Sequence, residues 1–353
     1  MDTSKMKLGF IAAIAILCCV LRVAADPADD LVRAEMTQHP IPGLALEIIQ
    51  QGKPLKIAGY GLANLEWQTP VTPQTVFEIG SVTKQFTAAG ILLLQQDGKL
   101  SVDDRISRYL KDIPESWSNI TIRHLLTHTS GIRNYTGMDG FELTRHLTQE
   151  EFIRKIGAEP LDFAPGDKWS YSNSAYSLLG FIIENASGHD YWHFMRRRIF
   201  GPLEMTSTTN RDPRGIIRFR ASGYEADSSG HYVNRDYDVT DIFSAGAIVS
   251  TVEDLAKWNA ALDAHTLLTE ASEGEMWTPV RLNNGTTHAY GFGWFLDSLN
   301  GRQNIGHSGS TDGFSASIQR FPKDGLAVIV LTNSNEEGVA TKVAKAIAML
   351  YLK

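Results

Sequence analysis

Cysteine is almost absent from this chain of 353 residues, because Cys18 and Cys19 are its only two and both lie near the N-terminus. The rest of the chain therefore has no disulfide bond, no thiolate metal ligand and no cysteine nucleophile. A hydrophobic core alone can stabilise a chain of this length. The sequence thus excludes a disulfide framework and thiol chemistry beyond the N-terminal segment.

A basic stripe is also missing. The formal net charge is −7, and loss of residues 1–25, which hold three basic residues and one acidic residue, would make it −9. Phosphate backbones are bound by clustered lysine and arginine, so nucleic acid is excluded as a partner. The run Arg196 to Arg198 is short and isolated, and we interpret it as a solvated helix face.

Signatures of bound cofactors and metals are missing as well. The chain contains no glycine-rich phosphate loop and no G-x-S-x-G sequence around any serine. His124 and His128 have the spacing of two zinc ligands on a helix, but no glutamate follows the first histidine and no third ligand is evident. We therefore predict that the protein uses neither a metal ion nor a cofactor.

One long apolar run is present, from Leu8 to Leu21, after Lys5 and Lys7. The small residues at 23–25 follow it, as before a signal-peptide cleavage site. We predict that residues 1–25 are a signal peptide and that the protein is exported, periplasmic or secreted, with no stable membrane insertion after cleavage. The alternative is an uncleaved anchor, although the run is short for a membrane span.

Apolar periodicity predicts an α+β fold. Strands near both ends bracket a helical middle, so we expect an antiparallel sheet built from both termini, flanked by helices, with an inserted, mostly helical subdomain. The sheet subdomain is expected at about 26–98 and 245–353, and the helical one at about 99–244. The predicted helices are 30–38, 81–96, 120–126, 174–186, 251–264 and 339–352, and the predicted strands are 44–50, 55–60, 290–296, 303–305, 314–321 and 326–332.

Ser81 and Lys84 form an S-x-x-K sequence at the start of the helix predicted at 81–96. They are one turn apart on one helix face, and Ser81 is expected at the N-cap. The N–H groups of a helix N-terminus suit a developing oxyanion. The sequence also occurs by chance, as at Ser4 and Lys7, so the alternative is a capping serine beside a solvated lysine.

Tyr171 and Asn173 form a Y-x-N sequence between a Pro-Gly turn and an apolar helix. A tyrosine held at a helix entry can approach a serine on another element. The alternative is a half-buried aromatic side chain with a hydrated hydroxyl. Tyr232 and Asn234 have the same spacing in a polar segment, and we interpret that copy as surface.

A third motif, His307-Ser308-Gly309-Ser310, is expected at the start of a strand. Small residues there let a substrate backbone approach closely, and the Ser310 N–H could complete an oxyanion pair with the Ser81 N–H. The alternative is an ordinary junction between a turn and a strand, with His307 on the surface.

The three motifs occur in this order, among segments such as FEIGSVTKQFTA, ITIRHLLTHTSGI and FAPGDKWSYSNSAYSLLG. From about residue 28 to its end, the chain resembles the serine β-lactamase and penicillin-binding protein superfamily. Within it, the chain is similar to class C β-lactamases, D-alanyl-D-alanine carboxypeptidases, D-aminopeptidases and family VIII esterases. The resemblance implies a β-lactamase/transpeptidase-like fold and a serine hydrolase with a covalent acyl-enzyme.

The resemblance also implies residue roles. Ser81 matches the acylated serine, Lys84 the lysine that accepts its proton, and Tyr171 the tyrosine that serves as general base. Lysine and tyrosine have ordinary pKa values of about 10, so the pKa of either must be lowered before it can act as a base near neutral pH. A neighbouring ammonium favours the phenolate of tyrosine, and burial favours the neutral amine of lysine. The sequence leaves open which of the two is the base. Substrate-binding positions are matched by Asn173, His307, Ser308 and Gly309, and the oxyanion hole by the backbone N–H groups of Ser81 and Ser310.

His307 departs from the pattern, because class C β-lactamases and most penicillin-binding proteins have lysine there. A histidine is mostly neutral at pH 7, so we expect inefficient β-lactam hydrolysis. A further hypothesis is that binding of carboxylate substrates strengthens below neutral pH as His307 becomes charged.

Several functions stay open. The leading one is an acyl-transfer hydrolase acting on an ester, a D-amino-acid peptide or a β-lactam, and a class C-like β-lactamase is an alternative. From another class, the chain could be a non-catalytic sensor or scaffold. We expect a small-molecule or peptidoglycan-like substrate, selected by loops around 133–150 and 211–240. The oligomeric state is open.

Overall fold

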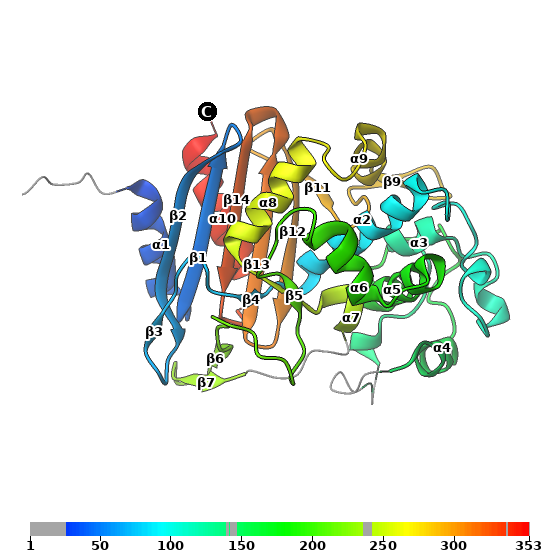
Figure 1. Cartoon of the computed structure of the whole chain (residues 1–353), viewed down its shortest axis with the longest axis horizontal. Coiled ribbons are helices and arrows are strands. Elements are labelled where there is room, and N and C mark those ends of the chain that lie inside the picture. The colour runs from blue at the N-terminus through cyan, green and yellow to red at the C-terminus, as the bar shows by residue number, and fades with distance from the viewer. Residues whose placement is uncertain (1–25, 139–140, 142–146, 236–241, 337, 353) are drawn as a thin grey trace, which may run out of the picture.

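The computed structural model describes residues 26–138, 141, 147–235, 242–336 and 338–352. Its largest element is a seven-stranded antiparallel sheet with the order β11-β12-β13-β14-β1-β2-β3 (Figure 1). The two ends of the chain meet where β1 pairs with β14, with Leu44 opposite Thr332. The predicted sheet from both termini is therefore confirmed. Its strands are β1 (Gly43–Gln50), β2 (Lys53–Asn64), β3 (Thr69–Pro70), β11 (Phe295–Leu299), β12 (Arg302–Thr311), β13 (Phe314–Phe321) and β14 (Leu326–Thr332).

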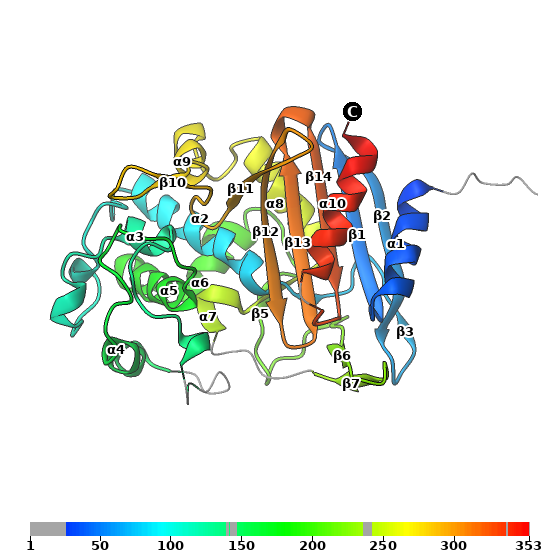
Figure 2. The same ribbon diagram turned by 180° about the vertical axis from the view of Figure 1, so that it is seen from behind.

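Helices cover both faces of the sheet. α10 packs against β13 and β14 with α1 beside it, and Figure 2 shows this pair in front of the sheet. α8 packs on the opposite face, against β1 and β14. The alternation of side chains along β1 serves both layers, since Leu44, Leu46 and Ile48 face the α10 layer while Ala45 and Ile49 face the other. The helices concerned are α1 (Pro27–Gln38), α8 (Val252–Asp263) and α10 (Val339–Tyr351).

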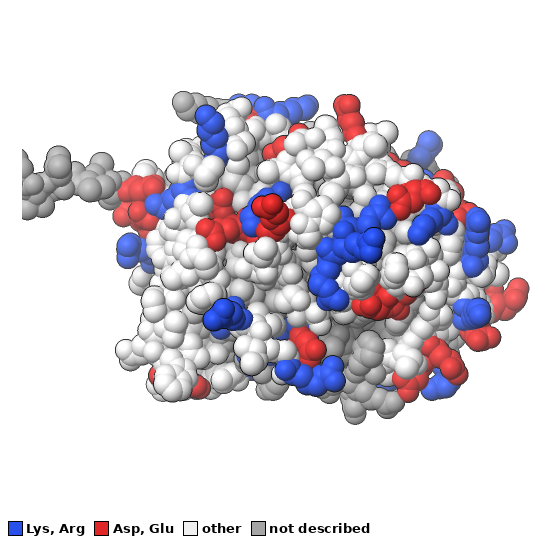
Figure 3. Space-filling view, viewed as in Figure 1, with Lys and Arg blue, Asp and Glu red and all other residues white. Residues whose placement is uncertain are grey.

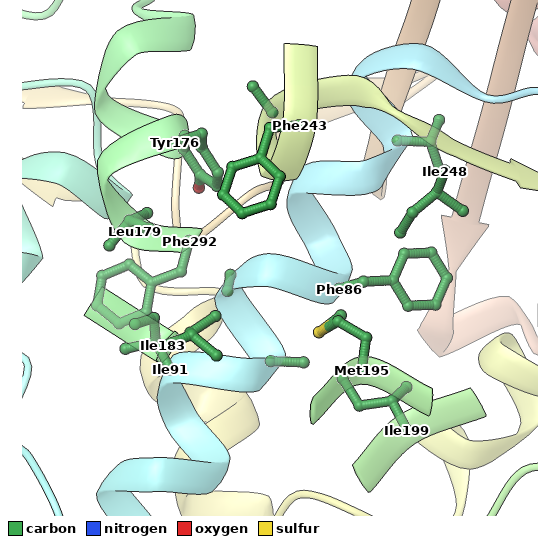
Figure 4. Close-up of a cluster of buried hydrophobic side chains, with 14 of the residues drawn as sticks. Phe86, Ile91, Tyr176, Leu179, Ile183, Met195, Ile199, Phe243, Ile248 and Phe292 are labelled. Atoms are coloured by element: carbon green, nitrogen blue, oxygen red, sulfur yellow. The ribbon is translucent and has the colours of Figure 1, made fainter. Parts of the chain in front are cut away.

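The middle of the chain forms a mostly helical part beside the sheet. Its central helix α2 packs against α5, α6 and α7, and Figure 4 shows α2 side chains Phe86 and Ile91 among the apolar residues of these helices. One hydrophobic core runs from the sheet face into this part, and the proposed subdomain limits stay a prediction. The helices are α2 (Thr83–Gln96), α3 (Ile122–Leu126), α4 (Gln149–Gly157), α5 (Asn173–Ser187), α6 (Tyr191–Met195), α7 (Phe243–Gly246) and α9 (Glu270–Met276). Short strands are β4 (Phe77–Glu78), β5 (Thr209–Asn210), β6 (Tyr224–Ala226), β7 (Tyr232–Asn234), β8 (Ile248–Ser250), β9 (Val280–Arg281) and β10 (Thr287–His288).

The predicted strand at 290–296 is wrong in its first part, because β11 begins only at Phe295. Gly293 has a φ of +75°, and a Cβ there would lie 2.8 Å from the carbonyl oxygen of Lys84. The segment before β11 therefore turns against α2 instead of extending the sheet. This turn places Tyr290 beside the site described below.

Charged side chains are mixed on the surface. On the face shown in Figure 3, lysine and arginine side chains are interspersed with aspartate and glutamate. Arg196 and Arg197 are exposed, and Arg198 pairs with Asp97 at 2.6 Å. Within the described ranges, no helix is long and apolar enough to cross a bilayer. The predicted leader at 1–25 lies outside the described residues.

Candidate active site

Ser81 lies in a single 3-10 turn, η1 (Gly80–Val82), just before α2. The prediction that Ser81 is the N-cap is wrong, because α2 begins at Thr83 and its N-cap, Val82, makes no side-chain hydrogen bond. The Oγ atom of Ser81 lies 2.9 Å from the Nζ atom of Lys84 instead. The hydroxyl is therefore available for chemistry rather than used for capping.

Lys84 is fully buried beneath Ser81. Its Nζ atom also lies 2.7 Å from Asn173 Oδ1 and 2.8 Å from the Ala245 carbonyl oxygen, and both of these oxygens only accept hydrogen bonds. A neutral amine that donates to both of these oxygens would have its lone pair left for the Ser81 hydroxyl. Burial lowers the pKa of Lys84 well below its ordinary value and so favours this neutral form. The arrangement places the Lys84 amine directly against the Ser81 hydroxyl.

Tyr171 and Asn173 are positioned by the start of α5. The N-cap Ser172 accepts a hydrogen bond from the Ala175 N–H, so Asn173 is the first helical residue and Tyr171 lies just outside the helix. The Tyr171 phenol hydrogen-bonds to the Ser81 side chain, and Lys84 Nζ lies 4.8 Å from the Tyr171 ring centre.

Burial raises the pKa of Tyr171 above its ordinary value, and the hydrogen bond with Ser81 offsets this only in part. The sequence left two candidates for the base, Lys84 and Tyr171, and burial shifts the pKa of both. It favours the neutral amine of Lys84 and disfavours the phenolate of Tyr171. Tyr171 stays a phenol, which suits it to donate a proton.

The third motif lies in the second half of β12, not at a strand start as predicted. β11 accompanies β12 only as far as Gly306, which is opposite Phe295. From His307 onward, the side of β12 that β11 leaves unpaired is available to face η1. An interior strand of the sheet thus becomes a local edge at the site.

Two glycines let β12 and η1 touch. A Cβ on Gly309 would lie 1.9 Å from the Ile79 carbonyl oxygen and 2.9 Å from the Ser81 nitrogen. A Cβ on Gly80, whose φ is +49°, would lie 2.6 Å from the Ser310 nitrogen. The backbone nitrogens of Ser81 and Ser310 therefore come from two segments that only glycine allows to pack this closely.

Two cavities meet at Ser81 and Ser310. The first has a volume of about 330 Å³ and is lined by Ser81, Tyr171, Phe295, His307, Ser308, Gly309, Ser310, Ser315 and Gly338. The second, of about 300 Å³, includes Asn173, Ala245, Asp312 and, from the expected specificity loop at 133–150, Tyr135 and Thr136. Parts of both expected loops, 139–140, 142–146 and 236–241, lie outside the described residues. The structure thus gathers the predicted site residues at one place.

His307 does not behave as the sequence suggested. The side chain is only 2% exposed, and burial, together with the nearby Lys84, lowers its pKa to about 3. The hypothesis that His307 becomes charged just below neutral pH is therefore wrong. Its Nδ1 atom lies 2.6 Å from the Ser308 carbonyl oxygen and its Nε2 atom 3.1 Å from Tyr290 Oη, so both ring nitrogens are engaged within the protein.

Sequence reasoning missed two buried neighbours of the site, His128 and Tyr290. His128 was considered only as a zinc ligand with His124, but α3 ends at Leu126 and His124 caps that helix through Thr121. Among the described residues, no three His, Cys, Asp or Glu side chains form a metal-binding group. The signal that could have found Tyr290 is Gly293, because a glycine in the predicted strand 290–296 indicates a turn that keeps Tyr290 out of β11.

A sheet built from both termini, with S-x-x-K, Y-x-N and H-x-G motifs converging on one serine, defines the class of β-lactamase-related serine hydrolases. The chain belongs to the Beta-lactamase family, whose model matches residues 28–352.

Individual relatives agree with this assignment. The chain is 34% identical over 296 residues to "Penicillin-binding protein 4*" of Bacillus subtilis, covering 79% of this chain and 65% of that protein. The chain thus spans less than two thirds of that relative. Among solved structures, it is similar to the penicillin-binding protein from Bacillus halodurans (TM-score 0.81, 26% identity, 92% and 99% covered). It is also similar to the D-amino acid amidase from Ochrobactrum anthropi SV3 (TM-score 0.79, 26% identity, 92% and 99% covered).

Proposed function

We propose that this protein is an acyl-transfer hydrolase in which Ser81 forms a covalent ester with the acyl group of its substrate. The observation that carries the proposal is the buried Lys84 amine, 2.9 Å from Ser81 Oγ, with two acceptor-only oxygens in position to hold both hydrogens of its neutral form. A serine hydroxyl needs such a base to become a nucleophile.

The proton follows a short path in this proposal. As Ser81 Oγ bonds to the acyl carbon, its proton passes to Lys84 Nζ. The Tyr171 phenol gives its proton to the leaving oxygen or nitrogen and regains one from Lys84, and a water then releases the acyl group by the reverse sequence. The N–H groups of Ser81 and Ser310 bind the oxyanion, and Asn173 keeps its amide N–H for a substrate carbonyl.

We further propose a substrate without a carboxylate beside the scissile bond, which means an ester or an amide rather than a β-lactam. His307 is uncharged and engaged on both ring nitrogens. Among the described residues that line the two cavities, there is no lysine or arginine, and Arg235, which lies 3.5 Å from the lining residue Asp312, is paired with that carboxylate. A carboxylate would therefore lose its water without gaining a cation. The similarity to a D-amino acid amidase supports an amide as one candidate.

Export is also a proposal. Residues 1–25 combine a positive start, an apolar run and a small-residue cleavage pattern. N-terminal sequencing of the protein recovered outside the cytoplasm of an expressing bacterium should begin at Asp26. An intact Met1 would favour the uncleaved anchor.

The experiment that tests the proposed function is intact-mass spectrometry of residues 26–353, minutes after mixing with a p-nitrophenyl ester, with Ser81→Ala as the control. The wild type should release p-nitrophenol and gain the mass of one acyl group, while the variant does neither. Hydrolysis that survives in the variant would exclude Ser81 as the nucleophile. A parallel sample with benzylpenicillin should show no adduct and no consumption, and either one would overturn the carboxylate argument alone.

A further inference from the structure

The hydroxyl of Tyr290 joins two buried histidines. Its Oη atom lies 3.1 Å from His128 Nε2 and 3.1 Å from His307 Nε2. Exposure is 0% for Tyr290, 1% for His128 and 2% for His307. The three residues come from the loop after α3, the turn before β11, and β12, and the proposed proton path uses none of them.

Backbone groups at both ends fix the direction of these hydrogen bonds. The Ser172 N–H donates to His128 Nδ1 at 3.1 Å, so Nδ1 carries the lone pair and Nε2 carries the hydrogen. His307 Nδ1 faces the Ser308 carbonyl oxygen, so Nδ1 carries the hydrogen and Nε2 the lone pair. Burial lowers the pKa of both histidines and so favours neutral rings. With both rings neutral, the His128 Nε2–H donates to Tyr290 Oη, and the Tyr290 hydroxyl is the donor available to His307 Nε2.

This chain of hydrogen bonds links the two walls of the site. One end is Ser172, which lies between Tyr171 and Asn173, and the His128 ring centre is 4.3 Å from that of Tyr171. The other end is Ser308 in the third motif. A hydroxyl can accept and donate at the same time, and removing it would leave two buried imidazole nitrogens without partners.

The surroundings of His307 contain few charges. The titratable groups that face it are Tyr290, Tyr171, Lys84 and His128. The neighbouring cavity adds His288, Asp297 and Lys345, of which the last two pair at 3.0 Å. A proton on either bridged histidine would place a buried positive charge near the Lys84 amine without a carboxylate partner among the described groups that face it.

We propose that Tyr290 is a positioning residue: through one directional hydrogen-bond chain it holds His128 and His307 in opposite neutral tautomers and so fixes the Tyr171 segment against β12. The inference rests on the proposed function for its effect on turnover, but its structural content is independent of it.

The first test reads the tautomers without substrate. In ¹⁵N-histidine-labelled wild-type protein, His307 should show the Nδ1–H form and His128 the Nε2–H form, with neither titrating between about pH 5 and 8. An imidazolium or the reversed tautomers at pH 7 would overturn the proposal. Because this measurement needs no turnover, a wild type without hydrolase activity would contradict the proposed function alone.

The second test compares Tyr290→Phe with Tyr191→Phe, another fully buried tyrosine whose hydroxyl bonds to Thr87. Tyr290→Phe should lower kcat about tenfold with little change in KM. Because His307 loses the donor to its Nε2 atom, its pKa should rise, and the acidic limb of the kcat profile should move to higher pH by about one unit. Tyr191→Phe should lose comparable thermal stability without that pH shift. Unchanged tautomers and an unchanged pH profile in Tyr290→Phe would reduce Tyr290 to a core residue.

Discussion

At the scale of the residue, Lys84 shows how burial changes the protonation of a lysine amine. A lysine amine in water is protonated at neutral pH and cannot take a proton. Here the Lys84 side chain is fully buried, and the two acceptors that hold the amine come from α5 and α7. The proposed role of Lys84 as the base therefore depends on the fold, because an isolated S-x-x-K sequence would have only an ammonium there.

Replacement of this amine should abolish acylation. For Lys84→Met, we expect kcat/KM with a p-nitrophenyl ester to fall at least about hundredfold, because the hydroxyl loses its base. Steady-state kinetics measures this. The matched control is Lys345→Met, which removes a lysine paired with Asp297 near the neighbouring cavity and should leave kcat within about twofold. A Lys84→Met enzyme whose kcat/KM is within about tenfold of the wild-type value would contradict the proposal that Lys84 is the base.

His307 should make stability depend on pH. Its pKa is about 3 in the fold against 6.5 for the ordinary group, so between these values the unfolded chain binds a proton that the native protein does not. The free energy of unfolding should therefore decrease as pH falls from 6.5 toward 3, with a contribution from His307 of about 1.4 kcal/mol per unit.

Urea unfolding at several pH values measures this dependence. The variant His307→Gln should show a shallower slope than the wild type in that window and a parallel curve above pH 7. Parallel curves throughout would mean that His307 takes up its proton in the native state.

At the scale of the element, the contact between β12 and η1 forms the site. For Gly309→Ala, the added methyl group would meet the Ile79 carbonyl at 1.9 Å and must push the strand from the turn. We expect kcat/KM to fall at least about hundredfold, because the two oxyanion N–H groups separate.

The control for this change is Gly274→Ala in α9, where an added Cβ meets nothing within 4 Å. That variant should keep its activity and gain up to about 1 kcal/mol of stability from helix propensity. An active Gly309→Ala enzyme would show that the strand and the turn can separate without harm to the oxyanion site.

Regular elements could be predicted from the sequence, and the contacts at the site could not. Apolar periodicity located β1, β13, β14, α5 and α10 to within a few residues, because burial repeats along them. The start of β11 was missed because one glycine, Gly293, packs against the backbone of α2, which is a tertiary contact.

The candidate site divides in the same way. Motif order and resemblance selected Ser81, Lys84, Tyr171 and the third motif, and these side chains do converge. The charge of His307 could not be read from the sequence, because its pKa depends on complete burial. His128 and Tyr290 belong to no local pattern with each other, since the fold alone joins them.

At the scale of the whole molecule, the acidic charge should discriminate among substrates. The chain carries a formal net charge of −7, and among the described residues no lysine or arginine lines the cavities beside Ser81. For two esters of equal length, one neutral and one with an acyl carboxylate, we expect kcat/KM of the anionic ester to be lower at low salt and to rise severalfold toward about 0.15 M salt. The neutral ester should show no such change. The same dependence of kcat/KM on salt for both esters would mean that the negative charge of the protein does not affect binding at the site.

The pairing of β1 with β14 also affects when the sheet can form during synthesis. A ribosome synthesises β1 long before β14, yet these strands are neighbours in the middle of the sheet. Until the last strands emerge, β1 lacks this partner, and contacts between such distant segments form slowly. A newly made chain should therefore complete the sheet only after β14 has been synthesised, a delay that would suit the proposed export.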